Sequence, residues 1–190
     1  MSKKILLIVE GDSDEVKFLR GLFKKCNKKT EYKIYSYRTN IHVLAQEIFN
    51  NYNDFDEGYI DVKLILASLE NDKKRKWLLY ENYSDIYMIF DFDPQHDHPH
   101  FDTIRRMISY FSDSTLQGKL FLNYPMMQSF KHFDQLPCLS FENLEVTLDE
   151  IKKYKEMVGK VSGFTDLTKY NYITYYSIAV HHLKKANKFL

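Results

Sequence analysis

The chain has 190 residues and a net charge of +1, from 27 lysine and arginine residues against 26 aspartate and glutamate residues. A domain of this length buries roughly two thirds of the surface that its unfolded chain exposes, so one hydrophobic core is sufficient. The balanced charge excludes the global positive field of a strongly basic nucleic-acid binder. Cys26 and Cys138 are far apart and lack a CxxC partner, which argues against a disulfide framework or a cysteine zinc site.

The apolar runs of the sequence indicate a protein that neither enters a membrane nor is secreted. The N-terminal run ILLIV ends at Glu10 after five residues, which is shorter than the roughly 7–15 apolar residues of a signal-peptide core. No later run approaches the roughly 18 apolar residues of a membrane-spanning helix. We therefore expect a soluble, cytoplasmic protein.

The first predicted elements are a strand, a tight turn and a helix. Residues 4–9 (KILLIV) form the short apolar run that is typical of a strand buried on both faces of a parallel sheet. Asp12 is a candidate N-cap with Glu15 three residues later, an arrangement that predicts a capping box. Residues 32–37 predict a second strand, and residues 41–52 predict a helix from the spacing of their apolar side chains.

The middle of the chain continues this alternation. Residues 62–69 (VKLILASL) predict another strand, and residues 85–93 (DIYMIFDFD) give the second strong signal for a buried strand. Residues 118–124 (GKLFLNY) predict the next strand. Between these last two strands the sequence predicts a helix, with an inward face made by Ile104, Met107, Ile108 and Phe111.

The last fifty residues are predicted to be helical. Thr147 and Glu150 have the spacing of a capping box and Gly159 is a helix stop, so one helix is expected between them, carrying Leu148, Ile151, Tyr154 and Val158. A final helix is expected over residues 170–188. Strands that alternate with helices predict an α/β fold with a mostly parallel sheet. We expect a catalytic core over residues 1–139 and a helical extension over residues 140–190 packed on it.

Acidic residues follow both strongly apolar strands directly. Glu10, Gly11 and Asp14 follow the first strand, and Asp91 and Asp93 follow the strand that begins at residue 85. Ligand sites of open α/β sheets lie beyond the carboxyl ends of the strands. If the two strands are parallel neighbours, the four carboxylates gather at one edge, and strand alternation turns Asp91 and Asp93 to the same side.

Such a cluster requires a cation or bound protons. Two carboxylates about 4 Å apart repel each other by roughly 4 kcal/mol at an effective dielectric constant of about 20. Hard oxygen ligands select Mg²⁺ or Mn²⁺, and Mg²⁺ usually binds through one or two carboxylates plus substrate phosphate. The predicted site residues, for both metal binding and catalysis, are therefore Glu10, Asp14, Asp91 and Asp93.

The sequences VEGDSDE (residues 9–15) and FDFDP (residues 90–94) resemble the two signatures of the TOPRIM domain. The resemblance covers about residues 1–135 and implies a compact α/β fold with a parallel sheet of about four strands. This family includes topoisomerases, bacterial primases, ribosomal-RNA maturation nucleases and OLD-type nucleases of phage defence. By this resemblance Glu10 is the acid or base near the metal, Asp91 and Asp93 are the metal-binding pair, and Asp14 is the second acidic residue of OLD-type members.

The chain departs from the family pattern after the second signature. Many relatives have a glycine shortly after the DxD pair, where this chain has Pro94, Gln95 and His96, and Asp91 follows Glu10 by 81 positions. The sequence contains no GxxxxGK[ST] phosphate loop and no cysteine zinc module, and it is too short for the strand-passage domains of a topoisomerase. The subfamily is therefore left open by these motifs.

We expect a free-standing nuclease that uses Mg²⁺ or Mn²⁺ to hydrolyse DNA or RNA, of the OLD type found in phage defence. A separate ATPase protein is a candidate partner, because nothing in this chain supplies nucleotide hydrolysis. Two alternatives stay open: a ribosomal-RNA maturation nuclease, and a non-catalytic module that docks nucleic acid or an ATPase through a metal. The choice between DNA and RNA and the oligomeric state are also open.

Other polar residues suggest weaker hypotheses. Basic residues at 17–33 and 73–76 are either local nucleic-acid contacts or solvated helix faces. His96, His98 and His100 follow the DxD pair, and we favour a phosphate contact over metal ligation for them. Lys131 and His132 are candidates to reach a phosphate, with surface placement as the alternative. His181 and His182 diverge by about 100° on a helix, so we interpret both as structural.

Overall fold

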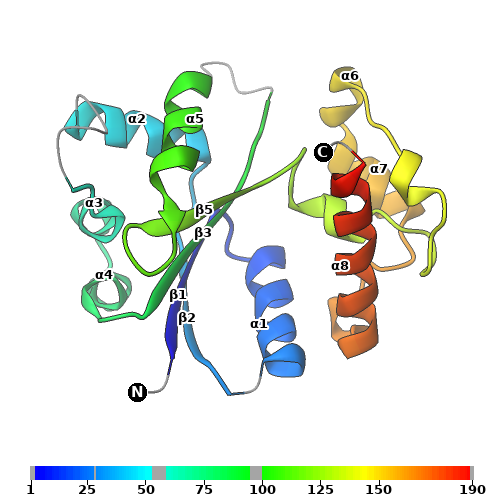
Figure 1. The fold of residues 1–190 in the computed structure, drawn as a ribbon, viewed down its shortest axis with the longest axis horizontal. Helices are drawn as coiled ribbons and strands as arrows, with labels where there is room; N and C mark the ends of the chain where they lie inside the picture. Colours follow the sequence, from blue (N-terminus) through cyan, green and yellow to red (C-terminus); the bar gives the residue numbers. More distant parts are fainter. Residues whose placement is uncertain (1–2, 28, 53–58, 95–99, 189–190) are drawn as a thin grey trace.

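The computed structural model describes residues 3–27, 29–52, 59–94 and 100–188. These residues form an α/β fold around one five-stranded sheet with the order β2-β1-β3-β5-β4 (Figure 1). Four strands are parallel, and the short β4 is antiparallel to β5. The strands are β1 (Lys4–Val9), β2 (Glu31–Ser36), β3 (Asp85–Asp91), β4 (Ser112–Asp113) and β5 (Gly118–Asn123). The predicted mostly parallel α/β sheet is confirmed.

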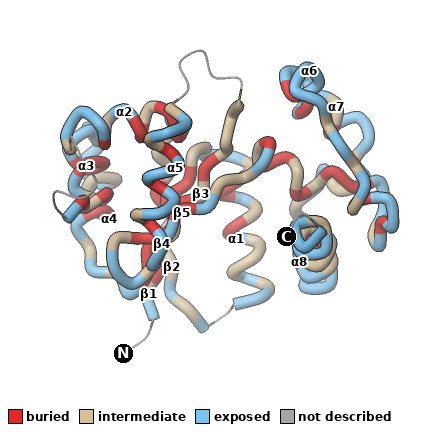
Figure 2. The backbone as a smooth tube through the Cα atoms, turned by 45° about the horizontal axis from the view of Figure 1, so that its top comes forward, coloured by how far each residue is buried: buried red, intermediate tan, exposed pale blue. Residues whose placement is uncertain are grey.

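Helices cover both faces of this sheet. On one face lie α2 (Ile41–Asn51), α3 (Val62–Leu69), α4 (Lys73–Tyr80) and α5 (Phe101–Tyr110), and on the other lies α1 (Asp14–Cys26) (Figure 1). The larger core fills the space between the sheet and the four-helix face, and a smaller core lies under α1. The buried segments accordingly follow the strands and the inward sides of the helices (Figure 2). Both faces of β1 are thus covered, as its continuous apolar run predicts.

The C-terminal segments pack beside α1. They comprise α6 (Leu148–Ile151), α7 (Tyr154–Val161), α8 (Tyr172–Asn187) and three short 3₁₀ helices, η1 (Met127–Lys131), η2 (Phe141–Asn143) and η3 (Leu167–Lys169). A third core joins them, and Phe18 and Leu22 of α1 pack against it. Its buried residues lie on both sides of position 139: Met127, Phe130, Phe133, Cys138, Phe141, Tyr170, Tyr175 and Ile178. The boundary at residues 139 and 140 stays a prediction.

Residues 62–69 form a helix and not the predicted strand. The carboxylate of Asp61 accepts hydrogen bonds from the backbone N–H groups of Lys63 and Leu64, so it caps α3 at its start. The residues at positions 62, 65 and 66 are buried while Leu64 is 55% exposed, which is the spacing of one helix face. A short apolar run does not by itself distinguish a buried strand from a helix, and here the N-cap decides.

Expectations for three other helices are also corrected. The capping box of Thr147 and Glu150 is present, but the helix after it is divided into α6 and α7, and Gly159 lies inside α7. Leu148 is 62% exposed and does not face the core. In α5 the predicted inward face holds except at Ile108, which is 45% exposed. The N-cap of α1 is Ser13, one residue after the predicted Asp12.

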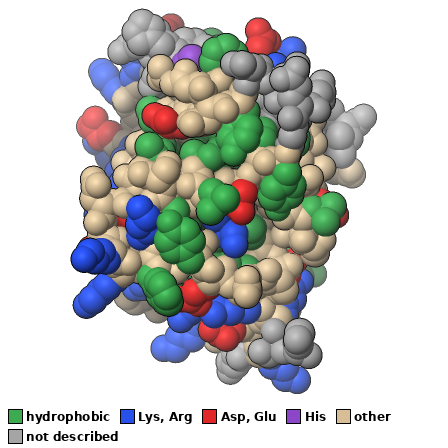
Figure 3. Space-filling model, turned by 90° about the vertical axis from the view of Figure 1, so that its left-hand side faces the viewer, with side chains coloured by type: hydrophobic (Ala, Val, Ile, Leu, Met, Phe, Trp, Pro, Cys, Tyr) green, Lys and Arg blue, Asp and Glu red, His purple; other side chains and the backbone are tan. Residues whose placement is uncertain are grey.

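The basic segment 73–76 lies on α4, on the face of the molecule that Figure 3 shows. Arg75 is half-buried there: its guanidinium lies over the ring of Tyr35 at 5.1 Å and pairs with Glu70 at 2.8 Å. This arginine therefore supports the fold, whereas Lys73, Lys74 and the 69% exposed Trp77 face the solvent. Within the described ranges, no helix has the length and apolar character needed to cross a bilayer.

Candidate active site

The turn after β1 holds Glu10 at the carboxyl edge of the sheet. The ladder between β1 and β2 continues past the strands, since the backbone N–H of Arg38 donates to the Glu10 carbonyl at 2.7 Å. The hydroxyl of Ser36 donates to the Gly11 carbonyl, also at 2.7 Å. Arg38 has a φ of 66°, a conformation that lets β2 turn away directly after this contact. The backbone of the EGxxD segment is therefore fixed by the neighbouring strand.

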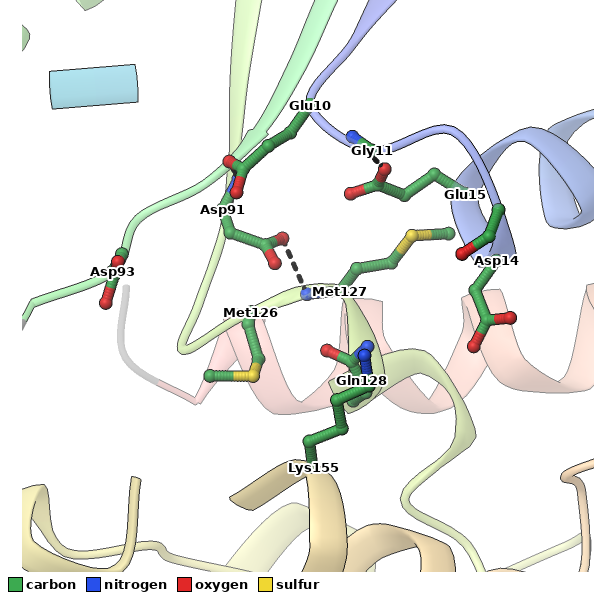
Figure 4. Close-up of a pocket in the computed structure, with 11 residues that line it drawn as sticks. Glu10, Gly11, Asp14, Glu15, Asp91, Asp93, Met126, Met127, Gln128 and Lys155 are labelled. Atoms are coloured by element: carbon green, nitrogen blue, oxygen red, sulfur yellow. Dashed lines mark hydrogen bonds between the residues drawn. The ribbon is translucent and has the colours of Figure 1, made fainter. Parts of the chain in front are cut away.

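Glu10 and Asp91 lie side by side at the ends of adjacent parallel strands (Figure 4). The backbone N–H of Asp91 donates to Glu10 Oε2 at 3.1 Å. The carboxylate of Asp91 accepts hydrogen bonds from the side-chain amide of Asn123 at 3.1 Å and from the backbone N–H of Met127 at 2.7 Å. Both predicted residues are thus oriented by neighbouring backbone.

Burial and like charge raise the pKa of three carboxyl groups in this region. Burial raises the pKa of Glu10 to about 8, and the charge of Asp91 adds to the effect. Burial also raises the pKa of Asp91, although the hydrogen bonds from Asn123 and Met127 oppose it. Burial, followed by the charge of Asp91, raises the pKa of Glu15 to about 7. Together these carboxyl groups hold negative charge that favours protons or a cation.

Glu15 also belongs to this group of carboxyl groups, although the sequence predicted it only as part of a helix capping box. Its side chain is 8% exposed and accepts a hydrogen bond from the backbone N–H of Gly11. A Cβ atom at position 11 would overlap the Glu15 carboxylate, so any larger residue there would displace this side chain from its contact with the backbone. The signal in the sequence is the four-residue spacing between Gly11 and Glu15 across the turn from strand to helix.

Asp14 lies near these carboxyl groups, but its negative charge is already neutralised by Lys131. Lys131 Nζ lies 3.0 Å from Asp14 Oδ2. The hydrogen bond from Lys131 lowers the pKa of Asp14. Lys131, a candidate phosphate ligand from the sequence, is thus engaged with one of the predicted carboxylates.

Asp93 lies beyond the end of the strand and apart from Asp91 (Figure 4). Strand alternation does not extend to it, because β3 ends at Asp91 and Asp93 has a φ of 42°. The fully buried His42 of α2 holds this turn: its Nε2 lies 3.2 Å from the carbonyl oxygen of Phe92 and 3.0 Å from that of Asp93. Its Nδ1 accepts the backbone N–H of His100 at 3.2 Å, so Nε2 carries the proton and donates to both carbonyls.

The roles predicted for the other histidines have different outcomes. His96 and His98 lie outside the described residues. His132 is buried, with Nδ1 3.0 Å from the hydroxyl of Tyr154, so it belongs to the C-terminal core and not to the carboxylate region. His181 is structural, since its Nε2 accepts the backbone N–H of Cys138 at 3.0 Å.

We call the cavity around these groups the carboxylate pocket. It has a volume of about 320 Å³, and all four predicted residues line it: Glu10, Asp14, Asp91 and Asp93 (Figure 4). Glu15 and the exposed Lys155 also line it, and the sequence did not predict either of them as a site residue. No group of three or more His, Cys, Asp or Glu side chains among the described residues has the arrangement of a preformed metal site. A pair of carboxylates still fits the usual mode of Mg²⁺ binding, in which water and substrate phosphate supply the other ligands.

No known protein family, curated protein or solved structure matches this chain. A function for it therefore has to be argued from the carboxylate pocket itself.

Proposed function

We propose that this chain is a metal-dependent nuclease that hydrolyses phosphodiester bonds of DNA or RNA through a TOPRIM-like site in the carboxylate pocket. The observation that carries the proposal is the contact between Glu10 and Asp91, which come from two motifs 81 positions apart and meet at the carboxyl ends of adjacent parallel strands. That edge is where open α/β sheets bind their ligands. Both motifs are those that resemble the TOPRIM signatures.

The chemistry of the pocket suits a phosphate and a hard cation. Glu10 and Asp91, the adjacent pair of carboxylates, would hold Mg²⁺ or Mn²⁺, because their oxygens are the ligands that these ions prefer, and Asp93 lines the same pocket farther away. When bound, the cation would polarise the phosphate and lower the pKa of a nearby water. Lys155 lines the same pocket, and we assign to it an electrostatic contact with the phosphate.

Glu10 is assigned the proton transfer. It is half-buried beside Asp91, so its carboxyl group exchanges a proton near neutral pH more readily than an exposed glutamate. The Asp14–Lys131 pair and Glu15 complete the wall of the pocket. We assign them positioning roles, because Lys131 already neutralises Asp14 and the Gly11 backbone already engages Glu15.

The test is cleavage by purified wild type and Glu10→Gln in Mn²⁺, on single- and double-stranded DNA and RNA, with and without a candidate ATPase partner. We expect Glu10→Gln to lose at least about 100-fold in rate, the usual contribution of a general acid or base. Glu156→Gln is the matched control, because Glu156 is an exposed glutamate paired with Lys160 at 2.6 Å on α7.

Two outcomes would contradict the proposal. Equal cleavage by wild type and Glu10→Gln would show that the activity comes from a contaminant or from another site. Metal binding without cleavage of any substrate, with and without the ATPase, would instead favour the non-catalytic docking module.

A further inference from the structure

A groove lies next to the carboxylate pocket on the same face of the sheet. Its floor is formed by β3 and β5 and its walls by α1, η1 and α8, and its volume is about 420 Å³. Rings of Phe18, Phe121, Phe130 and Tyr175 line it. We call this cavity the aromatic groove. Its size lies in the range of about 300–1,000 Å³ that is usual for small-ligand sites.

Strand register places the aromatic groove directly beside the proposed catalytic residues. In the ladder between β3 and β5, Phe121 pairs with Ile89 and Asn123 pairs with Asp91. Phe121 is therefore on the same face as Asp91, one strand across and two residues along, a separation of about 8 Å. Glu15 and Met127 line both cavities, so the groove and the carboxylate pocket are neighbours that share these two residues as a boundary.

The groove presents flat apolar surfaces that are already ordered. Phe121 is 45% exposed, although it lies in the sheet, and its ring packs beside Tyr87 with a centroid distance of 6.1 Å. The ammonium group of Lys119 lies 5.5 Å from the centre of the Phe121 ring. An exposed aromatic ring with a cation next to it is the combination that proteins use to stack an unpaired base while holding the charged backbone.

One buried polar atom in the groove has no partner. Nε2 of His182 is buried and makes no hydrogen bond to any part of the chain that the structure describes. His182 lines the aromatic groove and also a neighbouring cavity, and its Nε2 is the ring atom without a partner among the described residues. A buried polar atom without a partner costs free energy, and a polar edge group of a ligand in the groove would satisfy it.

We propose that the aromatic groove binds one unpaired base of a single-stranded nucleic acid, while the adjoining phosphate lies in the carboxylate pocket. The inference rests on the proposed function and sharpens it, because it names a single strand as the substrate. Nucleobases combine a flat apolar face with polar groups at the edge, which matches the rings and the unpartnered nitrogen of His182. Bases inside a duplex are stacked and paired and cannot enter between α1 and α8.

The test measures binding, so that it does not depend on cleavage. Glu10→Gln protein in Mn²⁺ is titrated with oligo-dT and with an abasic strand of equal length and charge. We expect oligo-dT to bind roughly tenfold more tightly, as one stacked base contributes. Adding Phe121→Ala should remove this preference and leave binding of the abasic strand unchanged. Adding Trp77→Ala instead is the matched control, because Trp77 is an exposed ring on α4, outside the groove.

The possible outcomes distinguish a failure of the groove proposal from a failure of the proposed nuclease function. Equal affinity for the two strands, or a preference that Phe121→Ala leaves intact, would overturn the groove proposal even if wild type cleaves nucleic acid. A base preference lost in Phe121→Ala would support the groove even if wild type cleaves nothing. Tight duplex binding with the same Phe121 dependence would also overturn it. Since Phe121 is exposed, its truncation is expected to leave folding intact, which circular dichroism checks.

Discussion

The two ends of β3 carry aspartates in opposite situations. Asp85, at the amino end, is 3% exposed and is surrounded by donors: the hydroxyls of Ser84 and Ser114 lie at 2.9 and 3.0 Å, and the ammonium group of Lys3 at 3.2 Å. Asp91, at the carboxyl end, accepts two neutral hydrogen bonds and lies beside Glu10.

The pKa values show the consequence of this difference. Burial alone would raise the pKa of Asp85, but the hydrogen bonds from Ser84 and Ser114 and the charge of Lys3 outweigh it, so the pKa of Asp85 is lowered. The pKa of Asp91 is raised, because its hydrogen bonds do not outweigh burial. A buried carboxylate with its own partners supports the fold, whereas one left with excess negative charge is suited to a ligand.

The largest effect expected from this contrast is stabilisation by metal. Mn²⁺ at about one hundred times its dissociation constant should raise the free energy of unfolding by about 2.7 kcal/mol, because it relieves the repulsion around Asp91. Calorimetry with and without Mn²⁺ measures the shift. It should disappear when Asp91→Asn is combined with Asp93→Asn and persist in Asp85→Asn. An unchanged melting temperature of wild type in saturating Mn²⁺ would argue against the metal site.

A matched pair of substitutions on one strand gives the next largest effect. Asp85→Asn should lower the free energy of unfolding by about 2 kcal/mol, because Lys3 loses its charged partner and the hydroxyl donors lose an acceptor. Asp91→Asn should leave the metal-free protein equally stable or more stable, since it removes a carboxylate whose pKa is raised by burial. Urea denaturation of both variants in EDTA measures this. Similar destabilisation by the two substitutions would contradict the proposed difference between Asp85 and Asp91.

The effect expected to be smallest for a change of one pH unit is the pH dependence of the metal-free protein. The pKa of Glu10, about 8, lies above its ordinary value of 4.5, so the folded protein keeps a proton that the unfolded chain releases. Stability should therefore fall as the pH rises from about 5 to about 8, by on the order of 1 kcal/mol per pH unit. Asp85 affects stability in a more acidic pH range. Because its pKa is lowered from the ordinary value of 3.8, its carboxylate stabilises the folded protein above that pH, and this stabilisation is lost as the pH falls further.

Glu10→Gln should reduce the slope of this profile, because glutamine does not titrate, and leave the part that comes from Glu15, whose pKa is raised to about 7. The measurement is urea denaturation in EDTA at several pH values, with Glu156→Gln as the control that keeps the slope. Equal slopes in wild type and Glu10→Gln would mean that Glu10 is ionised in the folded protein at neutral pH.

Local patterns were sufficient for the strands that build the site. The apolar runs at 4–9 and 85–93 predicted two buried strands, and the carboxyl-end rule predicted that Glu10 and Asp91 would lie at one edge. The same reasoning failed for residues 62–69, where a capped helix and a buried strand have similar composition. It also failed for Asp93, because strand alternation holds only while the strand continues.

The sequence by itself determined the parallel α/β architecture and the pair of acidic motifs, because both depend on periodicity and on the order of residues along the chain. Only the tertiary structure decided how each carboxylate is used. Lys131 reaches Asp14 from 117 positions away, and His42 holds the turn at Asp93 from 51 positions away. Those contacts depend on how distant segments pack, and they determine which charges are neutralised and which remain available for a cation.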